Sequence, residues 1–191
     1  MPIPISRKPS GYFHGSRDAK VQIEAFIDIQ CPHSKLAWPS LIALKEHYTK
    51  GEIGLAVHLI TLSNHRQAWD VSKGIFALAG DNDETFFAFA SYLYARQADY
   101  YNGPFRDKTH QDLLNLIADF ADDFSGFDRK EMLKRIETGE VYTDARTPIR
   151  FASTKGVWAT PTFFLNGSDL VGKFSEEPTL DEWRAVVDPL L

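Results

Sequence analysis

The chain has 191 residues, of which 43% are hydrophobic, and it contains a single cysteine, Cys31. One thiol excludes an internal disulfide and any structural zinc site that needs two or more thiolates. The formal net charge is -5, from 21 Lys and Arg against 26 Asp and Glu, and no stretch concentrates cations. We therefore expect no nucleic-acid partner. The length suits one domain, or one domain with a large insertion, and allows a normal hydrophobic core.

The start of the chain does not have the pattern of a signal peptide. Residues 1–10 carry two cations, but three prolines interrupt them and no long apolar run follows. Elsewhere no segment approaches the roughly 20 consecutive apolar residues of a membrane span. We therefore expect a cytoplasmic protein that has no membrane partner.

The first third of the chain predicts a strand, a helix and a second strand. Residues 21–29 alternate with the period of a strand, and Pro32 then suits the first turn of a helix. Apolar residues recur at helical spacing up to about residue 50, although Pro39 should kink this helix. Residues 53–62 alternate again. Together these segments predict a βαβ unit.

The middle of the chain has a helical period. From residue 63 to about 155 apolar residues recur every three or four positions, with breaks at 80–83, 101–104 and 125–128. This pattern predicts several helices. Many of the apolar residues are aromatic, and we interpret them as the core between stacked helices.

The end of the chain returns to strands. Residues 162–165 and 169–174 flank an Asn-Gly turn at 166–167, which is a strong hairpin signal. A capping box from Thr179 to Glu182 then predicts a final helix. The expected order is therefore βαβ, a block of helices, and ββα.

Cys31 is placed where chemistry is expected, at the junction of the first strand and its helix. Unpaired N-H groups and the positive end of the helix dipole meet there and favour a thiolate, which is nucleophilic at neutral pH. His33 can add positive charge or a hydrogen bond. A lone cysteine is more often a small buried hydrophobic residue, so Cys31 alone does not establish a catalytic site.

Two separated motifs strengthen the hypothesis. Residues 26–34 read Phe-Ile-Asp-Ile-Gln-Cys-Pro-His-Ser, and residues 156–167 read Gly-Val-Trp-Ala-Thr-Pro-Thr-Phe-Phe-Leu-Asn-Gly. Together they resemble the DsbA family of the thioredoxin superfamily. In that family Cys-Pro-His-Cys begins the first long helix, and a cis-proline loop packs against the reactive sulfur. The resemblance covers most of the chain.

The resemblance implies an α/β thioredoxin-like fold with a large inserted all-helical domain. The expected thioredoxin-like domain comprises residues 12–63 and 156–191. The expected helical insert comprises residues 64–155, and residues 1–11 form an N-terminal extension.

The resemblance also implies roles for individual residues. Cys31 corresponds to the exposed nucleophile of the family, and Pro32 and His33 correspond to the dipeptide that tunes it. Pro161 corresponds to the cis-proline. Thr160 corresponds to the preceding residue, whose backbone pairs with an extended substrate.

Ser34 departs from the family pattern, because the family has its second, resolving cysteine at this position. That thiol releases the mixed disulfide by internal attack, which Ser34 cannot do, although its hydroxyl can hydrogen-bond the Cys31 thiolate. Ala25, six residues before Cys31, replaces the buried acid of thioredoxins. Glu24 and Asp28 are nearby acids, and strand alternation places both on the face opposite Ala25.

The leading hypothesis is a monothiol thiol-disulfide oxidoreductase acting on a protein or glutathione thiol or disulfide. Glutathione or another external thiol would resolve its mixed disulfide, and no bound cofactor or metal is expected, since the histidines lack metal-ligand spacing. Two alternatives stay open. One is a glutathione-dependent transferase or isomerase of the kappa or 2-hydroxychromene-2-carboxylate isomerase type, and the other is a non-catalytic binding module.

Overall fold

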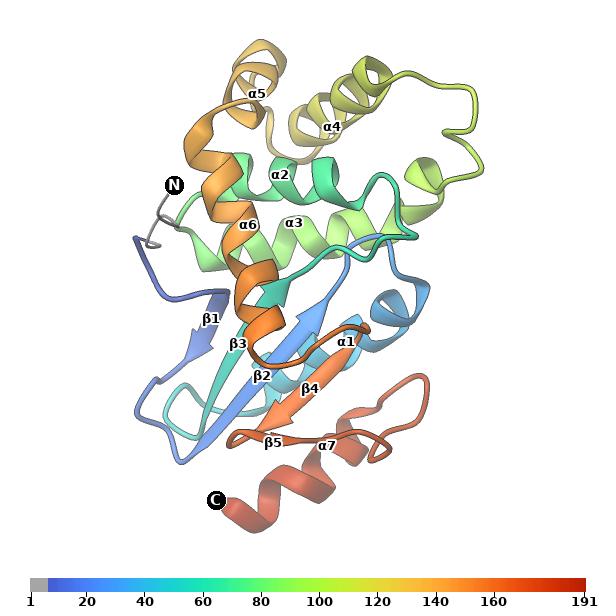
Figure 1. Ribbon diagram of the computed structural model, residues 1–191. Coiled ribbons are helices and arrows are strands. Elements are labelled where there is room, and N and C mark those ends of the chain that lie inside the picture. The colour runs from blue at the N-terminus through green and yellow to red at the C-terminus, as the bar shows by residue number, and fades with distance from the viewer. Residues whose placement is uncertain (1–6) are drawn as a thin grey trace.

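The centre of the protein is a five-stranded sheet with the strand order β1-β3-β2-β4-β5 (Figure 1). The computed structural model describes residues 7–191, so residues 1–6 of the predicted N-terminal extension lie outside the described residues. β2 and β3 are parallel, and the other pairs are antiparallel. The strands are β1 (Tyr12–Gly15), β2 (Val21–Ile27), β3 (Ile53–Leu59), β4 (Thr162–Leu165) and β5 (Ser168–Asp169).

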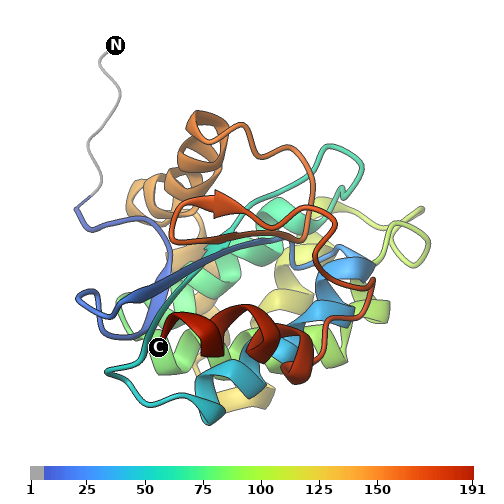
Figure 2. The ribbon, with the colours of Figure 1, turned by 90° about the horizontal axis from the view of Figure 1, so that it is seen from below.

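Helices cover both faces of this sheet. Figure 2 shows α1 (Pro32–His47) and α7 (Leu180–Val187) on one face and α6 (Gly139–Thr154) on the other. The helices between β3 and β4 are α2 (Ala68–Ala79), α3 (Asp83–Ala95), the short 3-10 helix η1 (Gln97–Tyr100), α4 (His110–Ser125), α5 (Arg129–Ile136) and α6; a second 3-10 helix, η2 (Asp188–Leu190), follows α7. The predicted thioredoxin-like fold, with helices inserted between its βαβ and ββα parts, is therefore confirmed.

The sequence analysis missed one strand and extended another too far. β1 has only four residues and no clear alternation, and it forms by pairing antiparallel with β3 at the sheet edge. The predicted strand 169–174 is only Ser168–Asp169 in the structure. The chain turns after it, because Asp169 Oδ1 accepts the N-H of Val171 and Gly172 has a φ of +73°.

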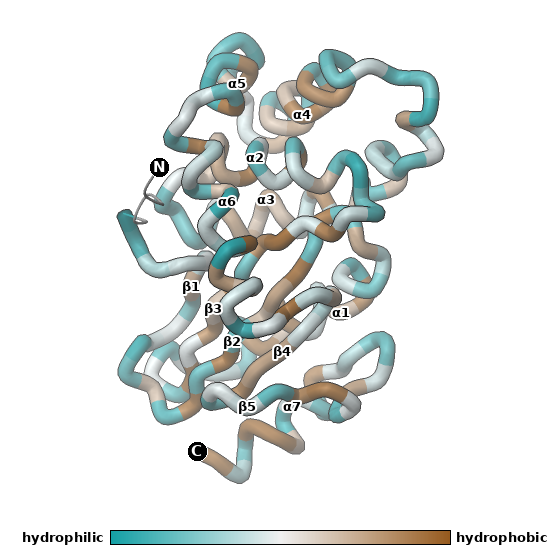
Figure 3. The backbone as a smooth tube through the Cα atoms, viewed as in Figure 1, coloured by the Kyte–Doolittle hydropathy of each residue, from teal (hydrophilic) through white to brown (hydrophobic). Residues whose placement is uncertain are grey.

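Apolar residues occur along the central strands (Figure 3), and buried side chains form a core on both faces of the sheet. On the α1 face, the indole of Trp183 from α7 is fully buried and donates to Ser40 Oγ at 3.0 Å. On the other face, the Phe26 ring packs against the ring of Phe151 from α6, with centroids 5.9 Å apart. Phe26 lies on the face opposite Ala25, and it is fully buried because α6 covers that face.

A buried histidine lies on the α6 face. The ring of His58 stacks on Phe26 with centroids 4.6 Å apart, and its Nδ1 lies 3.0 Å from Ser10 Oγ. Burial first, and then the charge of Lys155, lower the pKa of His58 to about 3. Glu24 lies 3.8 Å from His58 Nε2, but the Glu24 carboxylate is paired with Lys155.

We expect acid to destabilise the protein through His58. The unfolded chain takes up this proton near pH 6.5, whereas the folded protein resists it down to about pH 3. The free energy of unfolding is therefore highest above pH 6.5 and falls as the pH drops toward 3, by on the order of 4 kcal/mol. Urea denaturation across this window measures the loss. His58→Gln should flatten the curve, and His47→Gln at an exposed position should not; equal slopes in all three proteins would refute this assignment.

Candidate active site

Cys31 lies at the N-terminus of α1, as the sequence predicted. It is the N-cap residue, with extended backbone angles of φ -71° and ψ 125°, and Pro32 follows in the first turn. The first turn contains no acidic side chain. The N-H of Lys35 donates to the Cys31 carbonyl at 3.1 Å and closes the first helical turn. The positive end of the helix dipole is therefore not neutralised by a carboxylate of the first turn.

The Cys31 sulfur contacts the second motif. Sγ donates a hydrogen bond to the Thr160 carbonyl at 3.3 Å, and the Thr160-Pro161 peptide bond is cis. The structure thus brings together residues 129 positions apart. The expectation of an exposed sulfur is wrong, because Cys31 is only 3% exposed beneath this loop. A thiolate has no proton to donate, so the contact with Thr160 belongs to the protonated thiol.

Ser34 is fully buried in the first turn of α1. Its Oγ accepts a hydrogen bond from the backbone N-H of Asp28 at 3.2 Å. Within the described chain no hydrogen bond joins the Ser34 hydroxyl to Cys31. The hydroxyl therefore helps to fix the loop before the helix, a contact that the sequence analysis did not foresee.

Asp28 has a buried carboxylate that holds the loop before Cys31. Oδ1 accepts the N-H of Gln30 at 2.7 Å, and Oδ2 accepts the N-H of Leu62 at 2.7 Å. Oδ2 also lies 2.8 Å from Nδ1 of His65. A buried carboxylate needs such partners, because desolvation of an unpaired charge is costly. Asp28 thereby ties the end of β2 to the loop between β3 and α2.

Ala25, at the position of the thioredoxin acid, lies among apolar residues of the sheet. Ala25 is fully buried, and its partners in the neighbouring strands are Val57 and Phe163. Glu24 points to the opposite face, where it pairs with Lys155. The position that holds a buried acid in thioredoxins is therefore apolar in this protein, as the sequence indicated.

The helical region supplies residues that the sequence analysis missed. Gln97 in η1 is fully buried, and its Nε2 donates to the carbonyls of Ile29 and Cys31, both at 3.0 Å. The Tyr100 hydroxyl donates to the Ile29 carbonyl at 3.1 Å. Burial, and then the nearby Cys31 sulfur, raise the pKa of Tyr101. These groups fix the backbone on either side of Gln30 from a segment 66 residues further along the chain.

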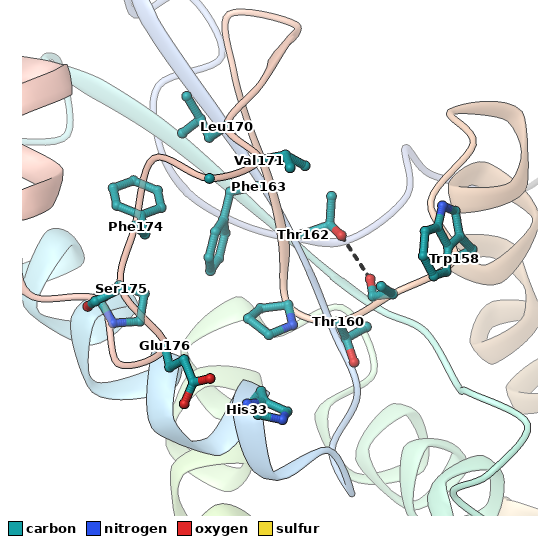
Figure 4. A pocket seen from close by; sticks show the side chains of 14 residues that line it. His33, Trp158, Thr160, Thr162, Phe163, Leu170, Val171, Phe174, Ser175 and Glu176 are labelled. Atoms are coloured by element: carbon teal, nitrogen blue, oxygen red, sulfur yellow. Dashed lines mark hydrogen bonds between the residues drawn. The ribbon is translucent and has the colours of Figure 1, made fainter.

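A groove of about 410 Å³ opens beside the cis-proline. His33, Thr160 and Pro161 line it, so it brings together three of the predicted site residues. Figure 4 shows Phe163 and Phe174 on one side of the loop, and Trp158 stands on the other. Trp158 is 85% exposed, which is an unusually large exposed fraction for a tryptophan.

The described residues include neither a candidate metal-binding cluster nor a helix that could span a membrane. Among residues 7–191, no group of three or more His, Cys, Asp and Glu side chains could hold a metal ion. In the same part of the chain, none of the helices has the length and apolar character needed to span a bilayer.

The protein has a thioredoxin-like fold with inserted helices between its βαβ and ββα parts, and a cysteine at the start of the first helix faces a cis-proline, the arrangement that the resemblance to the DsbA family implied. A family model described as thioredoxin matches residues 7–189. The chain therefore belongs to this thioredoxin family.

Solved structures share this arrangement. A protein-disulfide isomerase candidate from Pseudomonas syringae is 19% identical, with a TM-score of 0.78 over 95% of this chain and 98% of its own. Oxidised BdbD from Bacillus subtilis is 15% identical, with a TM-score of 0.72 over 95% of this chain and 96% of its own. DsbA from Chlamydia trachomatis is 16% identical, with a TM-score of 0.71 over 98% of this chain and 96% of its own. At these identities the likeness establishes the fold.

No curated protein sequence matches the chain.

Proposed function

We propose that the protein is a monothiol thiol-disulfide oxidoreductase that acts through Cys31. One observation carries the proposal: the Cys31 sulfur lies at a helix N-terminus, 3.3 Å from the carbonyl that precedes Pro161 and next to the apolar groove. The similar structures described as DsbA and as a disulfide isomerase candidate support it. Ser34 at the position of the second thiol makes the mechanism monothiol.

The proposed reaction is disulfide exchange. The Cys31 thiolate attacks one sulfur of a substrate disulfide, that S-S bond breaks, and the second substrate sulfur leaves as a thiolate that takes up a proton. The product is a mixed disulfide between Cys31 and the substrate. An external thiolate, from glutathione or another thiol, then attacks the substrate sulfur of this mixed disulfide. Cys31 is regenerated, and the number of disulfide bonds is unchanged.

Thr160 connects this reaction to substrate binding. The Cys31 proton, which is donated to the Thr160 carbonyl, must leave before the sulfur can attack. The same carbonyl can accept an N-H group from the backbone of an extended substrate. Substrate binding then competes with the hydrogen bond from the Cys31 thiol for the same carbonyl oxygen.

A mass measurement tests the proposal. Native protein exposed to oxidised glutathione should gain one glutathione on Cys31, and Cys31→Ser should gain none. The adduct should disappear when a reduced thiol is added. Urea-denatured wild-type protein provides the reference for an accessible cysteine. If denatured protein reacts and native protein stays unmodified, the proposal is refuted.

The burial of Cys31 favours a second candidate, a non-catalytic binding module that retains the fold. In that case the cysteine, 3% exposed, is a core residue, and native protein is inert in the same assay. Cys31→Ala would then leave the cellular function intact. The glutathione transferase or isomerase alternative has less support, because the described residues that line the groove include no Lys or Arg to bind the carboxylates of glutathione, and His33 is their one basic side chain.

We further propose that the protein acts in the cytoplasm, where small thiols that can resolve a mixed disulfide are kept reduced. Cell fractionation with a cytoplasmic marker tests this location, and recovery with periplasmic or secreted markers would contradict it.

A further inference from the structure

A second cavity shares one lining residue, Trp158, with the groove. It measures about 270 Å³ and is formed by the loop between β3 and α2 together with the end of α6. Trp158 lines both cavities. Because Trp158 is 85% exposed, its indole belongs to the surface that the two cavities share and not to the core.

The two cavities differ in chemistry. The groove beside Pro161 is lined mainly by apolar residues, among them Phe163, Leu170 and Phe174. The second cavity contains uncharged polar groups of the β3–α2 loop, supplied by Thr61, Ser63 and Asn64. In the described chain these three side chains make no hydrogen bond to another residue, so their donors and acceptors are open to a ligand.

Charge limits what can bind. No Lys or Arg lines either cavity, and Glu176 supplies the only carboxylate among their described lining residues. Glutathione carries two carboxylates, and among the described lining residues His33 in the groove is the one side chain that can become cationic, whereas the second cavity has none. A polypeptide segment has a neutral backbone and needs no such partner, so the charge of the lining favours a polypeptide over glutathione.

The position of Trp158 indicates which residues of a bound substrate would reach the two cavities. Trp158 stands two residues before Thr160, whose carbonyl faces Cys31. An extended chain advances roughly 3.3 Å per residue, so a substrate residue about two positions from the reacting cysteine reaches the level of Trp158. Residues on the two sides of that cysteine then meet two different cavities.

We propose that these cavities are two subsites for one polypeptide substrate, an inference that rests on the proposed function. An apolar side chain on one side of the substrate cysteine occupies the groove. An uncharged polar side chain on the other side, such as Thr or Asn, occupies the second cavity and bonds to Thr61 and Asn64. Trp158 lines both cavities and determines specificity. Glutathione reacts with Cys31 without occupying either subsite.

Synthetic peptides test the inference. Each peptide contains one cysteine as a mixed disulfide with thionitrobenzoate, a Leu two residues to one side, and either Thr or Glu two residues to the other side; both orders are made. Cys31 attacks the peptide sulfur, the Cys31-peptide disulfide forms, and thionitrobenzoate leaves as a coloured thiolate. The mixed disulfide of glutathione with thionitrobenzoate is the small reference. The rate constant per substrate concentration is measured for each probe.

In one of the two orders, the Thr peptide should react about tenfold faster than the Glu peptide and the glutathione probe. The combined change Thr61→Val and Asn64→Ala should bring the Thr-to-Glu ratio close to one, with the glutathione rate unchanged. Trp158→Ala should slow both peptides and leave the glutathione rate unchanged. The matched control, Thr143→Val with Asn115→Ala, changes residues that line neither cavity and should behave like the wild type.

Two failures can be told apart. Equal rates for the Thr and Glu peptides in both orders, or a ratio that survives the combined change, would overturn the subsites while reaction with the glutathione probe leaves the proposed function standing. If native protein reacts with none of the probes and denatured protein reacts with all of them, both proposals fail.

Discussion

Ser34→Cys should give a protein that releases its own mixed disulfides. Cys31 is the N-cap of α1 and residue 34 is the third helical residue, so their Cα atoms lie about 5 to 6 Å apart, within the range that a disulfide spans. A thiol at residue 34 can attack the Cys31-substrate disulfide, whereas the native hydroxyl cannot. We expect the lifetime of the glutathione adduct to fall by at least about tenfold, with an internal disulfide as the product.

The measurement is the time course of the adduct by mass spectrometry, with no reduced thiol present. Ser40→Cys is the matched control, because it adds a second thiol to the same helix nine residues from Cys31, or roughly 13 Å along its axis. That variant should keep the adduct as long as the wild type does. An adduct that persists equally in Ser34→Cys would contradict the proposed geometry of the site.

Asp28→Ala should be strongly destabilising. The substitution leaves the buried N-H group of Gln30 and the part-buried N-H group of Leu62 without their acceptor, and it removes the partner of His65. Breaking a buried and fully bonded carboxylate site of this kind costs about 3 to 5 kcal/mol. Urea denaturation at neutral pH measures the loss.

Two further variants test whether the lost free energy of unfolding comes from the hydrogen bonds of Asp28. Asp18→Ala, at an exposed position, should change the free energy of unfolding by less than about 0.5 kcal/mol. Asp28→Asn keeps one oxygen acceptor and should fall between the two. A small effect of Asp28→Ala would show that water can replace Asp28 as the acceptor for the N-H groups of Gln30 and Leu62, and that Asp28 does not stabilise the loop.

The sequence predicted the fold where local signals were strong. The alternation of β2, the Pro32 helix start, the turn at Asn166-Gly167 and the capping box at Thr179 are all local in the chain. β1 had no such signal, because its four residues become a strand only by pairing with β3. The burial of Phe26 could not be predicted for a related reason, since nothing near β2 in the sequence indicates that α6 covers its second face.

The candidate site was predicted in part. The two motifs placed Cys31 against Thr160 and Pro161, and the structure brings these residues together. Gln97 could not be predicted, because it contacts Cys31 from a segment with no sequence pattern that refers to the site. Asp28 was recognised only as a nearby acid. Strand alternation does not apply to it, since β2 ends at Ile27 and Asp28 belongs to the following loop.

The contact between Cys31 and Thr160 has a consequence for the chain while it is being synthesised. These residues are 129 positions apart, so at roughly 5 to 20 residues per second Cys31 is made on the order of ten seconds before Thr160. During that interval the thiol has neither its carbonyl acceptor nor its cover. A ribosome-bound chain therefore carries an ordinary, unprotected cysteine, and only the last part of translation shields it.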